Sequence, residues 1–228
     1  MCDEIDVRPS EVEFLETLKE GENSVVFKVR FREKICVMKV YHGRLPSEDD
    51  SPDLDVNLFV CESTAYHRLR SNGFCTRGVI PEFYGTIRKI QPADWPNLRM
   101  FLDDELPPNA ILIEYIPNLQ QIDLSNFSKQ RLAELRQILG DFHNVNVLHG
   151  DARPRNMAVS LGEQERVLWI DFDSAQTFPE GEKRSQMQEI WIEEEVKTMD
   201  YFVDALAQDY EEGKLNRTIS YYYDSFVV

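Results

Sequence analysis

The sequence predicts an α+β protein that is divided into two lobes. Strand-like patterns dominate residues 1–116, and helix-like patterns dominate residues 117–228. An order of strands first and helices second is typical of α+β proteins. An apolar segment that ends at Pro117 separates the two patterns. We therefore expect a β-rich lobe over residues 1–116, a helical lobe over residues 117–228 and a connection near residues 114–119.

Four segments of the first half have the character of strands. Residues 24–32 alternate regularly, which places Val25, Phe27, Val29 and Phe31 on one face. The other three segments are rich in β-branched and aromatic residues. They cover residues 34–41, 81–90 and 110–116.

One helix and two connections complete the first half. Residues 58–70 have helical period, and their apolar stripe includes Glu62. Residues 43–57 are polar and acidic and predict a loop. Residues 91–109 contain four prolines and form an unusually long connection, so we expect a functional or regulatory insert there.

The second half contains three helix-like segments. Ser128 is a suitable N-cap for a helix that runs to about Asn144. Residues 185–211 predict a second long helix, and residues 215–226 predict a third. The apolar face of the first of these helices consists of Leu132, Leu135, Ile138, Leu139 and Phe142.

The composition limits the compartment and the partners. No apolar run approaches the roughly 18 residues that span a bilayer, and the acidic N-terminus lacks a secretory pattern. The four cysteines have no metal-like spacing, which favours reduced thiols in a cytoplasmic or nuclear protein. The net charge of −16 argues against nucleic acid as a partner. It favours a cationic substrate, or it serves only to keep the protein soluble.

Two motifs carry most of the chemical information. The string HGDARPRN occupies residues 149–156, and DFD occupies residues 171–173. Each follows a short apolar segment, at residues 145–148 and 167–170. Together they supply carboxylates and a carboxamide, which are the oxygen ligands that Mg²⁺ prefers. The sequence therefore predicts a magnesium site that holds a triphosphate beside a hydroxyl group.

These motifs resemble the protein-kinase signature in order and spacing, namely His-x-Asp, an Asn five residues later, and then Asp-Phe-Gly. Gly150 stands where that signature has Arg, and Asp173 stands where it has Gly. The His-Gly-Asp form looks like the aminoglycoside phosphotransferase and choline kinase branch, and the longer strings look like fungal kinase-like domains. The resemblance implies a bilobal protein-kinase-like fold, with an N-terminal antiparallel sheet plus one helix and a shortened helical C-terminal lobe.

The resemblance also implies roles for the residues of the two motifs. Asp151 would accept the proton of the attacking hydroxyl, and Arg153 would contact the γ-phosphate. Asn156 and Asp171 would bind Mg²⁺, with ATP as the nucleotide. Asp173 either holds a second Mg²⁺ or is a solvated neighbour.

The nucleotide-binding residues implied by the resemblance lie in the first half. Lys39 closes an apolar strand and would contact the phosphates, and Glu62 would pair with it, since a carboxylate in an apolar stripe needs a partner. The segment 111–116 resembles a kinase hinge, whose backbone would bind the adenine edge. The full set is Gly21, Val26, Val37, Lys39, Glu62, Ile113, Glu114 and Ile116.

The expected activity is transfer of the γ-phosphate of ATP to a hydroxyl acceptor. No Ala-Pro-Glu follows Asp173, and the remaining residues 174–228 are few for a peptide-binding platform. A small molecule, in particular a cationic one, is therefore the favoured acceptor, with neither nucleic acid nor a membrane as partner. A compact protein serine/threonine kinase and a pseudokinase or nucleotide-binding interaction module remain alternatives.

Overall fold

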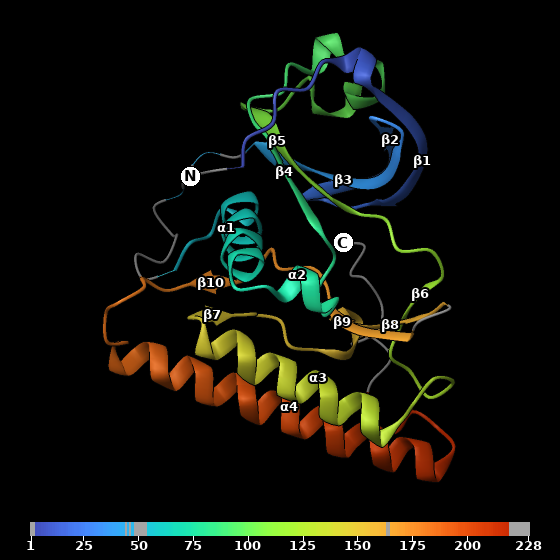
Figure 1. Cartoon of the computed structure of the whole chain (residues 1–228), viewed down its shortest axis with the longest axis vertical. Helices are drawn as coiled ribbons and strands as arrows, with labels where there is room; N and C mark the ends of the chain where they lie inside the picture. The colour runs from blue at the N-terminus through green and yellow to red at the C-terminus, as the bar shows by residue number, and fades with distance from the viewer. Residues whose placement is uncertain (1–2, 44, 46, 48–53, 163–164, 219–228) are drawn as a thin grey trace.

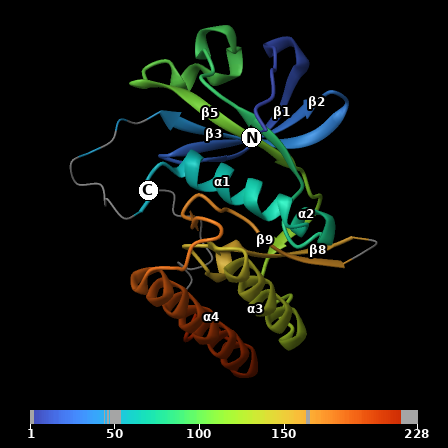
Figure 2. The same ribbon diagram turned by 60° about the vertical axis from the view of Figure 1, so that its left-hand side comes forward.

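The computed structural model describes residues 3–43, 45, 47, 54–162 and 165–218 (Figure 1). It has a five-stranded antiparallel sheet at one end and a pair of long helices at the other. The turned view in Figure 2 shows helix α1 between the sheet and these helices. The predicted α+β class is confirmed.

The five-stranded sheet has the order β1-β2-β3-β5-β4, and all neighbours in it are antiparallel. The strands predicted at residues 24–32 and 34–41, and the pair predicted at 81–90 and 110–116, are confirmed. The first strand was not predicted, because it is a bulged edge strand whose residues are mostly exposed. The strands are β1 (Val12–Glu20), β2 (Ser24–Phe31), β3 (Lys34–Gly43), β4 (Phe83–Ile87) and β5 (Leu106–Glu114).

The two faces of this sheet have different surroundings. The alternation of β2 buries the face that carries Val25, Phe27, Val29 and Phe31, as predicted. The residues of β3 and β5 that lie on this outer face belong to the same core cluster, which we call the outer-face cluster. The opposite, inner face is turned toward α1 (Leu58–Ser71) and the C-terminal half, so any site between the halves lies under it (Figure 1).

The long connection at residues 91–109 covers the outer face of the sheet. It folds into two 3₁₀ helices, η2 (Pro92–Asp94) and η3 (Pro96–Phe101), and its last residues belong to β5. Trp95, Leu98 and Phe101 are buried against the outer-face cluster. The connection therefore completes this core, and a regulatory role for it stays a prediction.

Helix α1 joins the sheet to the rest of the molecule. The Asn57 side chain caps it by accepting a hydrogen bond from Val60 N at 3.2 Å. Its buried stripe includes Cys61, Glu62, Ala65 and Leu69, as the helical period predicts. The short helix α2 (Phe74–Arg77) follows, and both pack into the largest core cluster.

Two long helices form the base of the C-terminal half. Helix α3 (Lys129–Asn144) begins after the cap Ser128, and α4 (Gln186–Glu212) begins after a capping box at Ser185. Both were predicted, and they lie side by side in Figures 1 and 2. The helix predicted at residues 215–226 is absent from its described part, residues 215–218, and the rest lies outside the described residues.

Short strands connect these helices and were not predicted. Isolated pairings of two to five residues leave little periodicity in a sequence. They form a three-stranded sheet, in the order β6-β8-β9, and a two-stranded one. The strands are β6 (Leu119–Gln121), β7 (Val147–Leu148), β8 (Met157–Leu161), β9 (Glu165–Trp169) and β10 (Gln176–Thr177), with 3₁₀ helices η1 (Pro9–Glu11) and η4 (Pro154–Asn156).

Two further observations concern the cysteines and the apolar character of the helices. Cys36, Cys61 and Cys75 are buried free thiols, and Cys2 lies outside the described residues. Within the described ranges, no helix has both the length and the apolar character needed to cross a bilayer.

The packing of the connection at residues 91–109 gives a stability prediction. Leu98 is 0% exposed in the outer-face core. Leu98→Ala should lower the free energy of unfolding by about 2–5 kcal/mol, because it removes buried apolar contacts and leaves a cavity. Leu102→Ala is the matched control, since Leu102 is 52% exposed in the same segment. Equal urea midpoints for the two variants would show that the segment does not support the sheet.

Candidate functional site

Two strand pairings bring the separated motifs together. Met157 of β8 lies opposite Trp169 of β9, so Asn156 and Asp171 emerge at the same end of that hairpin. Leu148 of β7 lies opposite Gln176 of β10, which places residues 149–151 beside residues 171–175. The short apolar segments noticed in the sequence are therefore the strands that position the site.

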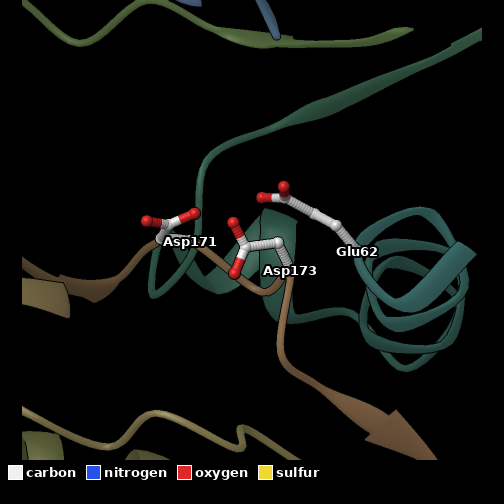
Figure 3. A group of neighbouring side chains, drawn as sticks. All are labelled: Glu62, Asp171 and Asp173. Carbon is white, nitrogen blue, oxygen red and sulfur yellow. The ribbon is translucent and has the colours of Figure 1, made fainter. Parts of the chain in front are cut away.

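The ammonium group of Lys39 is the centre of the site. It forms ion pairs with Glu62 at 2.9 Å and Asp173 at 2.9 Å, and a third, closer one with Asp171. Figure 3 shows the three carboxylates converging, Glu62 from α1 and the two aspartates from the loop after β9. An ammonium has three N–H donors. The N–H groups of Lys39 are therefore directed at these acids.

Glu62 connects three parts of the protein. Its carboxylate pairs with Lys39, accepts a hydrogen bond from the Tyr41 hydroxyl and accepts another from Phe172 N at 3.2 Å. The residue is 1% exposed. The predicted partnership of Lys39 and Glu62 is present, and the carboxylate also fixes the backbone after Asp171.

Burial and charge shift the pKa values of this cluster in different directions. Burial raises the pKa of Glu62 to about 7, with Asp171 and Asp173 adding to the effect and Lys39 opposing it. Burial likewise raises the pKa of Asp173 against the charge of Lys39. Burial opposes the ionisation of Asp171, yet Lys39 holds its pKa well below the usual range. Asp171 is thus the most acidic of the three carboxylates.

Lys39 itself stays charged. Burial alone would lower its pKa, but the charges of Asp171, Glu62 and Asp173 raise it well above the usual value. Three carboxylates and one ammonium leave an excess of negative charge in a mostly buried place. One carboxylate oxygen from each of these acids lies within 4.8 Å of one from each of the other two. This donor set fits a hard divalent cation such as Mg²⁺.

Phe172 holds the loop that carries the two aspartates. Asp171 has φ +65°, a left-handed conformation that is uncommon for a residue with a side chain. The next residue, Phe172, is 0% exposed and packs between the rings of His149 and Tyr66, with centroid distances of 4.7 and 5.2 Å. Tyr66 in turn stacks on Phe83 of β4. A continuous aromatic column therefore runs from the motif loop to the sheet.

Asp151 is held by three side chains. Asn156 Nδ2 donates to its carboxylate at 2.6 Å, and Arg155 pairs with it at 2.9 Å. Arg153 also pairs with it, at 3.2 Å. Asp151, Arg153 and Asn156 are brought together as the spacing predicts. Since Asn156 uses its amide nitrogen here, its amide oxygen is the atom that is suited to a cation.

His149 supports the loop, as the sequence suggests. Its ring is 0% exposed, with Nε2 3.1 Å from the Ile170 carbonyl oxygen and Nδ1 3.4 Å from Asp151 N. This pattern fits a neutral ring that donates from Nε2 and accepts at Nδ1. His149 therefore ties the two motif loops to each other.

Gly150 is required by a close backbone approach. Its φ is +81°, and a Cβ atom there would lie 2.1 Å from the Ser174 carbonyl oxygen. No other residue fits this conformation without moving the neighbouring loop. The glycine at this position of the HGDARPRN string is thus a steric necessity in this structure.

Glu195 of α4 anchors the same loop from below. Its carboxylate accepts hydrogen bonds from His149 N at 3.1 Å and Gly150 N at 2.6 Å, and lies 2.7 Å from His143 Nε2. The side chain is almost fully buried. Sequence reasoning missed it, because Glu195 is one of three consecutive glutamates and only the helical phase distinguishes it.

The residues predicted to line a nucleotide pocket share the inner face of the sheet. Val26 of β2 lies opposite Lys39, and Val37 of β3 lies opposite Ile113 of β5. Directly opposed residues point to the same side of an antiparallel sheet. Gly21 lies apart, in the turn between β1 and β2. Its Cβ would meet only Ser24 O at 3.5 Å, so the turn itself does not require glycine.

The predicted hinge connects β5 to β6. Glu114 ends β5, and its carboxylate binds the guanidinium of Arg166 at 2.6 and 3.1 Å. Ile116 is buried against Ala158 and Leu168 of the small sheet. The connection is therefore fastened to the C-terminal half by an ion pair and an apolar contact. Its binding to an adenine edge stays a prediction.

Comparison with known proteins finds no relative for this chain. No protein-family model matches the chain, and a search of curated proteins found no match either.

The anchoring role of Glu195 gives a second prediction. Glu195→Gln should lower the free energy of unfolding by roughly 2–3 kcal/mol, because an amide cannot accept from all of these buried donors. Amide hydrogen exchange at His149 and Gly150 should accelerate in the same variant. Glu194→Gln, at an exposed neighbour that pairs with Lys197, is the control and should leave both measurements unchanged. Unchanged exchange in Glu195→Gln would contradict the anchoring role.

The titration of Glu62 gives a third prediction. Its pKa is about 7 in the folded protein against the usual 4.5. Between these values the folded state binds more protons, so this group's contribution to stability falls as the pH rises from 4.5 through 7. Glu62→Gln cannot titrate there. The stability of the wild type relative to this variant should therefore decrease between pH 5 and pH 8, measured by urea denaturation. Parallel curves would contradict the shifted pKa.

Proposed function

We propose that this protein is an ATP- and Mg²⁺-dependent phosphotransferase that moves the γ-phosphate to a hydroxyl acceptor. The observation that carries the proposal is the placement of Lys39. It lies on the inner face of the sheet, pairs with Glu62 of α1 and reaches Asp171 of the motif loop. We propose in addition that the fold is protein-kinase-like and that the protein is cytoplasmic.

The residues of the site divide into two groups by task. Asp171, through a carboxylate oxygen, and Asn156, through its amide oxygen, would hold Mg²⁺, which neutralises phosphate charge when bound. Lys39 would bind the α- and β-phosphates after Asp171 releases it. The apolar side chains of Val26, Val37 and Ile113 would cover the base, with the backbone of Glu114 and Ile116 at its edge.

Asp151 and Arg153 would act on the reacting groups. The acceptor oxygen forms a bond to the γ-phosphorus while the bond from that phosphorus to the bridging oxygen of ADP breaks. Asp151 takes the proton of the hydroxyl, and Arg153 stabilises the phosphoryl oxygens. The products are a phosphate ester and ADP. Arg155 and Asn156 would orient the Asp151 carboxylate for this step.

A small acceptor is favoured over a peptide. Protein kinases that are regulated through a phosphorylated activation loop carry an arginine where this chain has Gly150. The contact with Ser174 O leaves no room for a side chain at that position. The net charge of −16 favours a cationic acceptor through long-range attraction.

One observation favours a second candidate, a nucleotide-binding module without turnover. All three donors of Lys39 are matched by carboxylates, and Asp173 takes one of them at 2.9 Å. A phosphate must displace at least one of these acids before Lys39 can bind it. The cost of this exchange lowers affinity and is compatible with a site that binds without catalysing transfer.

The fourth prediction separates these functions. Mg-ATP should raise the melting temperature of the wild type, and Asp171→Asn should abolish this shift. Asp151→Asn should keep the shift but lose at least about 100-fold in turnover, because a positioned base contributes about that factor. ADP release, measured against a panel of amino alcohols, sugars and basic proteins, identifies the acceptor class. No shift with saturating Mg-ATP would refute both candidates, and wild-type turnover would refute the module.

A further inference from the structure

A row of four side chains crosses the inner face of the sheet. Lys19 of β1 lies opposite Val26 of β2, Val26 lies opposite Lys39 of β3, and Lys39 lies opposite Ile111 of β5. Opposed residues of antiparallel strands point to the same side. Lys19 and Lys39 therefore face the same space, with Val26 between them.

The spacing of this row suits a polyphosphate. Neighbouring strands lie about 4.8 Å apart, so the backbones at Lys19 and Lys39 are separated by roughly 10 Å. Each side chain is long and flexible enough to bring its ammonium toward the other. A triphosphate that passes below Val26 would lie between the two cations.

The surroundings of Lys19 differ from those of Lys39. Lys19 is half-buried, and it forms no ion pair with any residue in the described ranges, whereas Lys39 forms three. Lys19 therefore presents a cation to the same face of the sheet as Lys39, and no carboxylate in the described ranges pairs with it.

The turn between β1 and β2 supplies few other groups for phosphate. Gly21 is its one glycine, and Gly21 N already donates to Ser24 O at 3.0 Å. Phosphate-binding loops commonly use glycines and free backbone N–H groups. A charged side chain at the end of β1 replaces what this turn lacks.

We propose that Lys19 is a second phosphate-binding residue, which contacts the triphosphate from the side opposite Lys39. This inference rests on the proposed nucleotide-dependent function and extends it. Glu62, Asp171 and Asp173 exceed the charge of Lys39, so an incoming triphosphate meets a negative site. Lys19 offsets part of that excess at the place where the phosphates would lie.

The test compares nucleotides that differ in phosphate number, and it is the fifth prediction. Lys19→Met keeps the length of the side chain and removes its charge. Its affinity for Mg-ATP should fall about tenfold in calorimetry, since a hydrogen bond to a charged group contributes at least that factor. Its affinity for adenosine should stay within twofold of the wild type. The dependence of Mg-ATP affinity on KCl should also become shallower.

Lys28→Met is the matched control. Lys28 faces the same side of β2, opposite Glu16, but its ammonium lies over the Tyr115 ring at 4.2 Å. It should lose no preference for ATP over adenosine. Lys19→Gln serves as a second variant, and thermal unfolding checks that each variant is folded.

The outcomes separate the two proposals. Wild-type affinity for Mg-ATP in both Lys19 variants would overturn the role of Lys19 and leave the proposed function intact. An equal loss for ATP and adenosine, or the same selective loss in Lys28→Met, would overturn it too. If the wild type binds neither adenosine nor Mg-ATP, the proposed function fails, and the role of Lys19 fails with it.

Discussion

The contact of Lys39 with three carboxylates is the constraint on which the arrangement of the two halves depends. The lysine comes from the sheet, Glu62 from α1, and Asp171 and Asp173 from the loop after β9. A buried ammonium costs much free energy unless such partners compensate for its lost hydration. The sheet, the helix and the motif loop must therefore meet at one point. The aromatic column through Phe172 packs correctly only when they do.

A second set of buried groups fixes the conformation of the loop at residues 149–151. Glu195 accepts from the backbone of residues 149 and 150, and His149 links that loop to Ile170. Neither side chain has a role in the proposed transfer itself. They act on Asp151 by fixing the backbone that carries it. The site thus combines partly exposed acids that would touch ligands with a buried acid, Glu195, that positions the loop.

The sequence predicted the parts of this arrangement that leave a local pattern. Alternation in β2 and the helical period of α1 predicted the strand, the helix and the inward position of Glu62. The spacing of the motifs predicted the grouping of Asp151 with Asn156. Edge strand β1 was not predicted, because its bulges break the alternation and its side chains are mostly exposed. Glu195 and the shared face of Lys19 and Lys39 depend on packing and register between distant segments, which no local pattern encodes.

The tight contact at Gly150 has a consequence for how this site can change over time. A residue with a side chain at this position collides with the backbone of Ser174, so its gain requires a prior shift of the neighbouring loop. That loop is held by Phe172, which is itself clamped between two aromatic rings. A side chain at position 150 is therefore accommodated only after the loop has moved, and the loop moves only if the packing of Phe172 changes. We therefore expect the glycine and the aromatic contacts to vary together rather than one at a time.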